Sequence, residues 1–390
     1  MVHVMKICVI GGGIGGLAFA RAAALKGADV TILEQAEAIK EVGAGLQISP
    51  NGIRVIEALG LKDELTQTSV RGRAVSLRNY SDAREVVRLD LTKLPDDQGY
   101  YFVHRADLVD LLAKGSRDAG VNIQLMQTVS EISNDARPFV TTTKGDIFHA
   151  DLIVGADGVH SVAREKIIGK SAPFFTHHVA WRATIPNDLH FPAEVRVYMG
   201  PKRHIVCYPL RGGVLLNIVA VQERSEWAEE GWHVQDDPKN LESVFADFGN
   251  EVHAILERVK DVSIWGLFRH NVADPWHDGR TVLLGDAAHP TLPFMAQGAN
   301  MALEDAWVLA DEVTSPKSIE VALAAYQLKR KDRAKRIIDT ASNNAWKYHL
   351  SSPPVRWAAH AGMRVLGKVA PNKLLGQFDW IYDHDVTKSP

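Results

Sequence analysis

The segment Lys6–Glu34, near the start of the chain, is the feature that most restricts what this sequence can fold into. It begins with the apolar, β-branched run Ile7–Ile10, which is typical of a strand buried on both faces. A G-x-G-x-x-G motif follows directly, formed by Gly11, Gly13 and Gly16. Apolar residues at helical spacing and a second strand-like run come next, and Glu34 ends the unit 18 residues after the last glycine. This order predicts a strand–turn–helix–strand unit.

Each part of this unit has a physical role in binding a dinucleotide. Gly11 makes the tight turn, Gly13 lets the backbone approach a pyrophosphate, and Gly16 lets helix and strand pack closely. The helix N-terminus supplies positive potential for phosphate. An acid at the position of Glu34 accepts hydrogen bonds from an adenosine ribose and disfavours a 2′-phosphate there. The sequence therefore predicts an α/β fold with a Rossmann-like dinucleotide-binding domain.

Two later segments each place an aspartate at the predicted carboxyl end of a buried strand. Asp151–Arg164 contains Asp157, and Arg280–Pro290 contains Asp286. Ligands of open α/β sheets bind at that end of the strands. Asp-Gly and Gly-Asp pairs also favour plain turns, so either aspartate alone is equally well explained as a turn residue. Together with the glycine motif, the pair favours a ligand-binding role.

The composition restricts the possible partners. The chain has 390 residues and a net charge of −3, from 44 basic and 47 acidic residues. This balance disfavours nucleic acid as a partner, and no run reaches the ~18–20 apolar residues of a membrane span. Cys8 lies inside the first predicted strand, so a structural disulfide with Cys207 is not expected. These features predict a cytoplasmic protein.

The three motifs, in this order, resemble those of single-component FAD-dependent aromatic hydroxylases of the para-hydroxybenzoate hydroxylase type. The resemblance covers nearly the whole chain and extends to His104–Leu108. It implies FAD as the cofactor and NADH, with NADPH as the alternative, as the reductant. The residues that it assigns to FAD binding are Gly11, Gly13, Gly16, Glu34, Gln35, Ala44, Arg105, Val129, Asp157, Asp286, Gly298, Ala299 and Asn300.

Within the family, Gly43–Gly52 and Pro201–Leu210 are similar to segments of salicylate 1-hydroxylase and 3-hydroxybenzoate 6-hydroxylase. The resemblance implies a monooxygenase in which a flavin C4a-hydroperoxide transfers one oxygen atom of O2 to a small phenolic acid, such as salicylate or 3-hydroxybenzoate. Thr291–Phe294 stands where the 3-hydroxybenzoate enzymes are expected to carry a glutamine. The ring position that is attacked, any loss of carbon dioxide, and the choice between monomer and homodimer stay open.

The chain divides into three expected parts. They are a discontinuous FAD-binding domain (1–73, 98–175 and 266–345), an inserted substrate domain (74–97 and 176–265) and a small helical C-terminal element (346–390). Alternating runs predict an antiparallel sheet in the substrate domain, whereas 227–260 is expected to be mostly helical. Val355–Lys368 is a basic amphipathic helix, which suits a membrane surface, a second subunit or the protein's own flank.

A phenol reacts better as its phenolate, so a base near the ring hydroxyl is expected. His204 is the predicted base, and its alternative is a place in a solvated basic patch. Tyr208 lies four residues further along the same predicted strand, and therefore on the same face, where it is a candidate for orienting the substrate or relaying the proton. Gln47 is a further candidate for a polar contact near the ring. Pro293 stiffens the loop before Gly298, where helix amides are expected to face the flavin N1–C2=O edge.

Other residues carry weaker hypotheses. Arg182 or Arg203 is a candidate for holding a substrate carboxylate. His289 is expected to stabilise its turn, and His177–His178 lacks metal-binding spacing, so no metal is expected. Two rival functions remain: a flavin-dependent halogenase, suggested by Trp181–Pro186, and a non-hydroxylating flavoprotein that acts as an oxidase or a redox-sensing partner.

Overall fold

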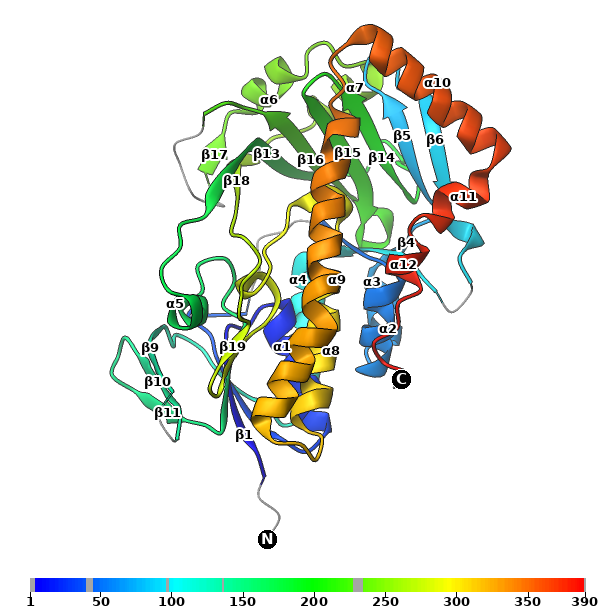
Figure 1. The fold of residues 1–390 in the computed structure, drawn as a ribbon. Helices are drawn as coiled ribbons and strands as arrows, with labels where there is room; N and C mark the ends of the chain where they lie inside the picture. Colours follow the sequence, from blue (N-terminus) through cyan, green and yellow to red (C-terminus); the bar gives the residue numbers. More distant parts are fainter. Residues whose placement is uncertain (1–3, 40–44, 96–97, 135–136, 227–233, 389–390) are drawn as a thin grey trace.

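The structure of the protein is a computed structural model that describes residues 4–39, 45–95, 98–134, 137–226 and 234–388. Two large β-sheets lie one above the other in Figure 1, and the long helix α9 (Ile319–Tyr348) runs beside both. Because α9 packs against strands of both sheets, it fixes the position of one sheet relative to the other.

The predicted N-terminal unit forms the centre of a six-stranded sheet. Its strands, in spatial order, are β19 (His277–Asp278), β20 (Thr281–Leu283), β12 (Leu152–Gly155), β1 (Lys6–Ile10), β2 (Asp29–Leu33) and β8 (Asn122–Gln124). All neighbouring pairs are parallel except the edge pair β19–β20. Strand β1 is buried from its second residue onward, as expected for a parallel strand covered on both faces.

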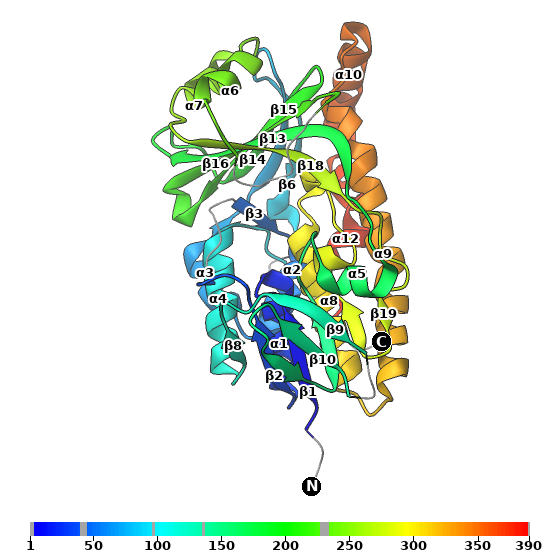
Figure 2. The same cartoon turned by 90° about the vertical axis from the view of Figure 1, so that its left-hand side faces the viewer.

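The glycines of the motif allow the close packing around β1. Gly11 has a φ of +103°, and a Cβ there would lie 2.4 Å from the carbonyl oxygen of Ala156. A Cβ on Gly16 would lie 2.1 Å from the carbonyl oxygen of Gly11. Helix α1 (Ile14–Leu25) can therefore start directly against the sheet. It packs against α4 (Arg105–Asp118) and α8 (Gly298–Val313), and α9 packs against α8 (Figure 2).

The second sheet has eight strands. In spatial order they are β17 (Val234–Asp236), β18 (Val262–Arg269), β13 (Phe174–Pro186), β16 (Leu215–Glu223), β15 (Arg203–Leu210), β14 (Glu194–Gly200), β5 (Ala74–Asn79) and β6 (Glu85–Asp90). All pairs are antiparallel except β14–β5. The alternating runs thus form the predicted antiparallel sheet. The helical expectation for 227–260 is wrong at Val234–Asp236, which pairs as an edge strand, and residues 227–233 lie outside the described part.

Side-chain alternation separates the two faces of this sheet. Ile205 and Cys207 of β15 pack into a core with α6 (Pro238–Val244) and α7 (Asn250–Leu256). His204 and Tyr208 point to the opposite face, toward the six-stranded sheet. The sheet therefore has one face covered by helices and one face available to line a cavity between the two sheets.

Smaller elements complete the fold. The three-stranded sheet β3 (Gly45–Ile48), β7 (Tyr101–His104) and β4 (Val70–Arg71) is accompanied by α2 (Pro50–Ala58) and α3 (Lys62–Thr68). A second small sheet comprises β11 (Ile147–His149), β10 (Phe139–Thr142) and β9 (Val129–Ser133), and α5 (Val162–Ile168) packs against β9.

The C-terminal residues are helical, as expected, in α10 (Pro353–Val369), α11 (Pro371–Gly376) and α12 (Asp379–Tyr382). Helix α10 lies along β6, so it packs on the protein's own flank, although Trp357 and Val369 stay exposed (Figure 1). No helix of the described residues combines the length and the apolar character that a membrane crossing requires. The domain boundaries given above stay a prediction.

Candidate active site

A cavity of about 660 Å³ is lined on one side by strands of the eight-stranded sheet, and on the other by loops and helix N-termini that follow strands of the six-stranded sheet. Its size is in the range of small-molecule and cofactor sites. One end is formed by the N-termini of α1 and α8, and the other by the inner face of the eight-stranded sheet. Aliphatic side chains of β5, β6, β14, β15 and β16 make up much of the sheet wall, and few polar groups interrupt them.

Two helix N-termini open onto this cavity. Gly13 is the N-cap of α1 and lines the cavity, and no atom lies within 4 Å of where its Cβ would be. Gly298 is the first residue of α8, and both Gly298 and Ala299 line the cavity. Neither helix has a side-chain cap or an acid in its first turn. The first amides of both helices are therefore available to an anionic or hydrogen-bond-accepting ligand.

Asp286 and Arg105 line the same end of the cavity. Asp286 follows β20 and is accessible from the cavity, while α4 begins at Arg105. Removal of water from around the Asp286 carboxyl raises its pKa, and the charges of His289 and Arg105 oppose this shift. The Asp286 carboxylate can bind hydroxyl groups of a ligand. The Arg105 guanidinium and the two helix N-termini can bind the phosphates of the same ligand.

Other predicted cofactor residues lie outside the cavity lining. Both Glu34 side-chain oxygens accept backbone hydrogen bonds, from Gly12 N (2.6 Å) and Ala36 N (2.9 Å). Gln35 is exposed next to Glu34, and Val129 is buried in the core at the start of β9. Gly11 and Gly16 act within the turn, as described above. Ala44 lies outside the described residues.

Asp157 and Asn300 brace the site rather than line it. The Asp157 carboxylate accepts hydrogen bonds from Ser161 Oγ and from Ala163 N (3.2 Å), so it fixes the start of α5. Asn300 is fully buried, and its Nδ2 donates to the carbonyl oxygen of Gln47 at 3.0 Å, which ties α8 to β3.

The opposite end of the cavity contains the predicted catalytic residues. The cavity is lined by all four of them: His204, Tyr208, Gln47 and Pro293. Residues that were predicted from distant parts of the chain therefore meet at one place in the structure. Tyr100 Oη donates a hydrogen bond to Gln47 Oε1 at 2.7 Å. Burial, together with the nearby rings of His349 and His178, keeps the pKa of His204 well below its usual value. His204 is 2% exposed, so the alternative of a solvated basic patch is wrong.

The structure distinguishes between the two arginine candidates. Arg182 of β13 lines the cavity, and its guanidinium lies 4.4 Å from the centroid of the Trp265 ring. Arg203 points to the other side of the sheet, where both Asp247 oxygens accept hydrogen bonds from it at 2.7 Å. A positive charge is therefore present at the apolar end of the cavity, and it comes from Arg182.

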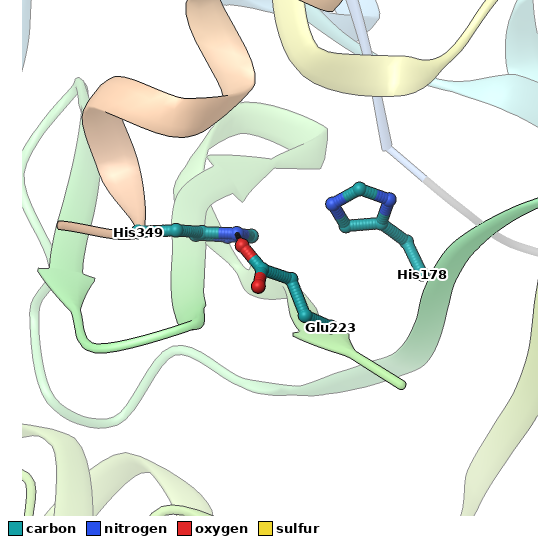
Figure 3. A group of neighbouring side chains, drawn as sticks. All are labelled: His178, Glu223 and His349. Carbon is teal, nitrogen blue, oxygen red and sulfur yellow. Dashed lines mark hydrogen bonds and ion pairs between the residues drawn. The ribbon is translucent and has the colours of Figure 1, made fainter. Parts of the chain in front are cut away.

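Three histidines outside the cavity lining bear on the predictions. His289 is buried and bonded to Asp305, in agreement with a structural role. In the described part of the chain, His178, Glu223 and His349 are the only group that could hold a metal ion, with candidate ligand atoms within 4.8 Å of one another (Figure 3). The sequence did not predict this cluster, because His349 lies 126 residues beyond Glu223.

Comparisons with known proteins decide the family. Residues 4–341 match the profile of the family described as FAD binding domain. A 3-amino-4-hydroxybenzoate 2-monooxygenase of Streptomyces cremeus is 34% identical over 359 residues, which cover 90% of this chain and 89% of the relative. A 3-hydroxybenzoate 6-hydroxylase of Klebsiella oxytoca is 31% identical over 367 residues, with 90% of each chain covered. This protein belongs to the FAD-dependent aromatic hydroxylases.

The fold of these hydroxylases is also found by structural comparison. The structure of a salicylate hydroxylase substrate complex has a TM-score of 0.83 to this chain at 24% identity, and covers 98% of this chain and 96% of that one. The family, the fold and the enzyme class predicted from the sequence are thereby confirmed. The named relatives support hydroxylation and neither the halogenase nor the non-hydroxylating alternative.

The residues at the helix-rich end fit the FAD of these hydroxylases. The open space at Gly13 and the uncapped N-terminus of α1 suit a pyrophosphate. Asp286 and Arg105 suit the ribityl and phosphate groups, and the N-terminus of α8 at Gly298 suits a ring carbonyl. FAD is thus the cofactor of this protein, and in this family a reduced nicotinamide is its electron donor.

Proposed function

We propose that this hydroxylase acts on a small phenolic acid of the hydroxybenzoate class. The observation that supports this most directly is the arrangement of the apolar end of the cavity, where His204 and Arg182 lie among aliphatic and aromatic side chains. A neutral imidazole suits a ring hydroxyl, and a guanidinium suits a carboxylate. The S. cremeus and K. oxytoca relatives are named for substrates that carry both groups.

Bound FAD supplies the redox chemistry, taking electrons from NADH or NADPH and activating O2 for transfer of one oxygen atom to the ring. The protein residues orient the reactants and move a proton. In this proposal the amides at Gly13 and Gly298, with Arg105 and Asp286, hold the cofactor. The loop containing Pro293 lines the cavity and is assigned to positioning the ring, and the aliphatic wall is assigned to excluding water.

His204 has the role of the base that removes the phenolic proton. Its lowered pKa keeps the imidazole neutral at neutral pH, so that the ring can accept a proton. Tyr208, on the same face of β15, is assigned to orienting the substrate, and Gln47 is placed by Tyr100 to make a polar contact near the ring.

Arg182 has the role of binding the substrate carboxylate, and its substitution tests the proposal. Arg182→Gln is expected to lower kcat/KM for an aromatic acid by about 10- to 100-fold, since a charge-assisted hydrogen bond is worth about 1.5–3 kcal/mol. The measurement is NADH oxidation with product identification by mass, using salicylate, 3-hydroxybenzoate and 3-amino-4-hydroxybenzoate beside the corresponding phenols that lack the carboxylate.

The matched control is Arg203→Gln, which removes an arginine that points away from the cavity. Arg203→Gln should keep the preference for the acid over the phenol, whereas Arg182→Gln should lose it. Equal preference in the wild type and Arg182→Gln would refute the carboxylate assignment. NADH consumption that yields only hydrogen peroxide with every acid and phenol would refute the proposed substrate class.

We also propose NADH as the reductant, and either a monomer or a homodimer as the assembly. A cytoplasmic location is supported by the two cysteines, both of which are buried and unpaired.

A further inference from the structure

The predicted base His204 is the inner end of a chain of hydrogen-bonded side chains. His204 Nδ1 lies 2.7 Å from His349 Nε2, and His349 Nδ1 lies 2.8 Å from Glu223 Oε1. The side chain of His349 is 2% exposed and that of Glu223 is 36% exposed. The chain therefore leads from the cavity wall, through a buried imidazole, to a carboxylate in contact with solvent.

The chemistry of the outer group fixes the direction of these hydrogen bonds. The Glu223 carboxylate can only accept, so the proton of a neutral His349 ring is on Nδ1. His349 Nε2 then has a lone pair and accepts from His204 Nδ1–H. Within the described residues no partner is found for His204 Nε2, and the ring lines the cavity. The free lone pair of His204 is thus available to a ligand hydroxyl.

Backbone hydrogen bonds connect the segments that carry these three side chains. Glu223 N donates to the carbonyl oxygen of Lys202 at 2.8 Å, and Lys202 N donates to the carbonyl oxygen of His349 at 3.2 Å. The turn between β14 and β15, the end of β16 and the end of α9 are therefore tied at one point. The aromatic rings of Phe294 and Tyr348 enclose His204, with centroids 5.9 and 5.4 Å away, and limit access of water to it.

We propose that His349 and Glu223 form a proton relay that carries the phenolic proton from His204 to solvent. This inference rests on the proposed function and deepens it. The phenol O–H bond breaks and His204 Nε2 gains the proton, while His204 Nδ1–H passes to His349 Nε2 and His349 Nδ1–H passes to Glu223. Glu223 then releases one proton to water. The reverse sequence can return a proton to the product oxygen, so the relay needs no oxidant or co-reactant.

The charged and titratable neighbours are compatible with a neutral resting relay. His204 faces His349, which directly follows α9, and His178 of β13; His349 faces Glu223 of β16 as well as His178. Burial lowers the pKa of His204 and that of His349, the latter to about 4, although Glu223 opposes the shift at His349. Both imidazoles are therefore neutral at neutral pH, which lets each accept one proton as it gives up another.

His178 lies beside this relay but is not a link in it. Its Nδ1 donates to the carbonyl oxygen of Thr176 at 2.6 Å, and its ring centroid lies 5.7 Å from that of His349. Figure 3 shows His349 and Glu223 in contact and His178 set apart from them. A bound metal ion at these three residues would be the competing role, and it would have to replace the His349–Glu223 hydrogen bond.

The relay is tested by following ionisation of a bound phenol without turnover. The probe is a nitro-substituted hydroxybenzoate, whose phenolate absorbs visible light, bound to the FAD-loaded protein. A stopped-flow jump from mildly acidic to mildly alkaline pH should give fast appearance of the phenolate in the wild type, independent of buffer concentration. His349→Gln and Glu223→Gln keep hydrogen-bonding groups but break the relay, and should slow this step by at least ~10-fold.

Two further variants separate a relay from a structural role. His349→Ala should be slow as well, and added imidazole should accelerate it, because imidazole can fill the space that the side chain leaves. His178→Gln is the matched control and should ionise the probe at the wild-type rate. All variants are first checked for bound FAD and for probe affinity.

Four outcomes would overturn the relay. They are a wild-type rate in His349→Gln, equal slowing in His178→Gln, a wild-type rate proportional to buffer concentration, and a stoichiometric metal that His178→Gln loses. Failure of the proposed function looks different. In that case the bound probe would still ionise through His349, while no hydroxybenzoate would be hydroxylated.

Discussion

At the scale of single residues, His204 shows how a position on a strand decides the chemistry of a side chain. The neighbouring Arg203 points to the helix-covered face and pairs with Asp247, whereas His204 points into the cavity. One step along β15 therefore separates a structural ion pair from a candidate base. Burial lowers the pKa of His204, so the imidazole stays unprotonated even in mildly acidic solution, where an exposed histidine would be charged.

His204→Ala is expected to lower kcat by about 10²–10⁴-fold, because this is the usual contribution of a general base. The measurement is product formation at neutral pH by the FAD-loaded protein. His190→Asn is the matched control: His190 is exposed between β13 and β14 with a φ of +49°, which asparagine tolerates. A loss of less than about threefold in His204→Ala, with FAD still bound, would remove His204 from the role of base.

At the scale of elements, a buried ion cluster joins α8 to α9. Arg330 of α9 pairs with Glu304 at 2.6 Å and with Asp305 at 2.7 Å, both on α8. Arg333 adds a contact to Glu304 at 2.8 Å, and Asn51 of α2 donates to the same carboxylate at 2.6 Å. Because α8 begins at the cavity and α9 ends at Tyr348, directly before His349, this cluster fixes both ends of the proposed site.

Glu304→Gln is expected to destabilise the protein by about 3–5 kcal/mol, because it leaves the Arg330 charge buried and under-compensated. Urea unfolding measures the change. Asp311→Asn is the matched control on the same helix; it removes an exposed pair with Lys26 and should cost less than about 1 kcal/mol. Equal losses in the two variants would show that burial of the cluster contributes nothing.

The same carboxylate predicts a pH dependence of stability. Burial alone would raise the pKa of Glu304, but Arg330 and Arg333 lower it from 4.5 to about 2. The folded state thus has the depressed pKa. The stabilisation is fully present above pH 4.5 and is lost as the pH falls toward 2. Glu304→Gln should accordingly show a smaller loss of stability over this interval than the wild type.

At the scale of the whole molecule, the cavity exists because two sheets from interleaved segments face one another. The cofactor end comes from α1, α4 and α8, and the substrate end from β13, β15 and β16. Ligand binding should therefore stabilise the entire fold and not one part of it.

FAD at about 100 times its Kd is expected to add about 2.7 kcal/mol to the free energy of unfolding, and the melting temperature should rise with FAD concentration. Gly11→Ala should lose this effect, because its Cβ would lie 2.4 Å from the Ala156 oxygen at the turn. Gly145→Ala has a similar positive φ, +87°, but no atom within 4 Å. It should cost only about 1–2 kcal/mol and keep the FAD response, which thermal unfolding with and without FAD would measure.

The sequence located the two helix N-termini at the cofactor end of the cavity because the signals for them are local. Gly11, Gly13 and Gly16 act within one turn, and α8 begins at Gly298, where the sequence analysis expects helix amides. Strand alternation also placed His204 and Tyr208 on one face. These inferences need only backbone geometry over a few residues, so they are readable from the chain.

Tertiary structure decided which distant residues meet. The choice of Arg182 over Arg203 depends on which face of the eight-stranded sheet is covered by helices. The contact between His204 and His349 spans 145 residues, and it exists only because α9 crosses from one sheet to the other. The sequence by itself determined the family, the fold class and the cofactor, because those depend on local motifs. The polar partners of the candidate base were decided by long-range packing, which no local pattern encodes.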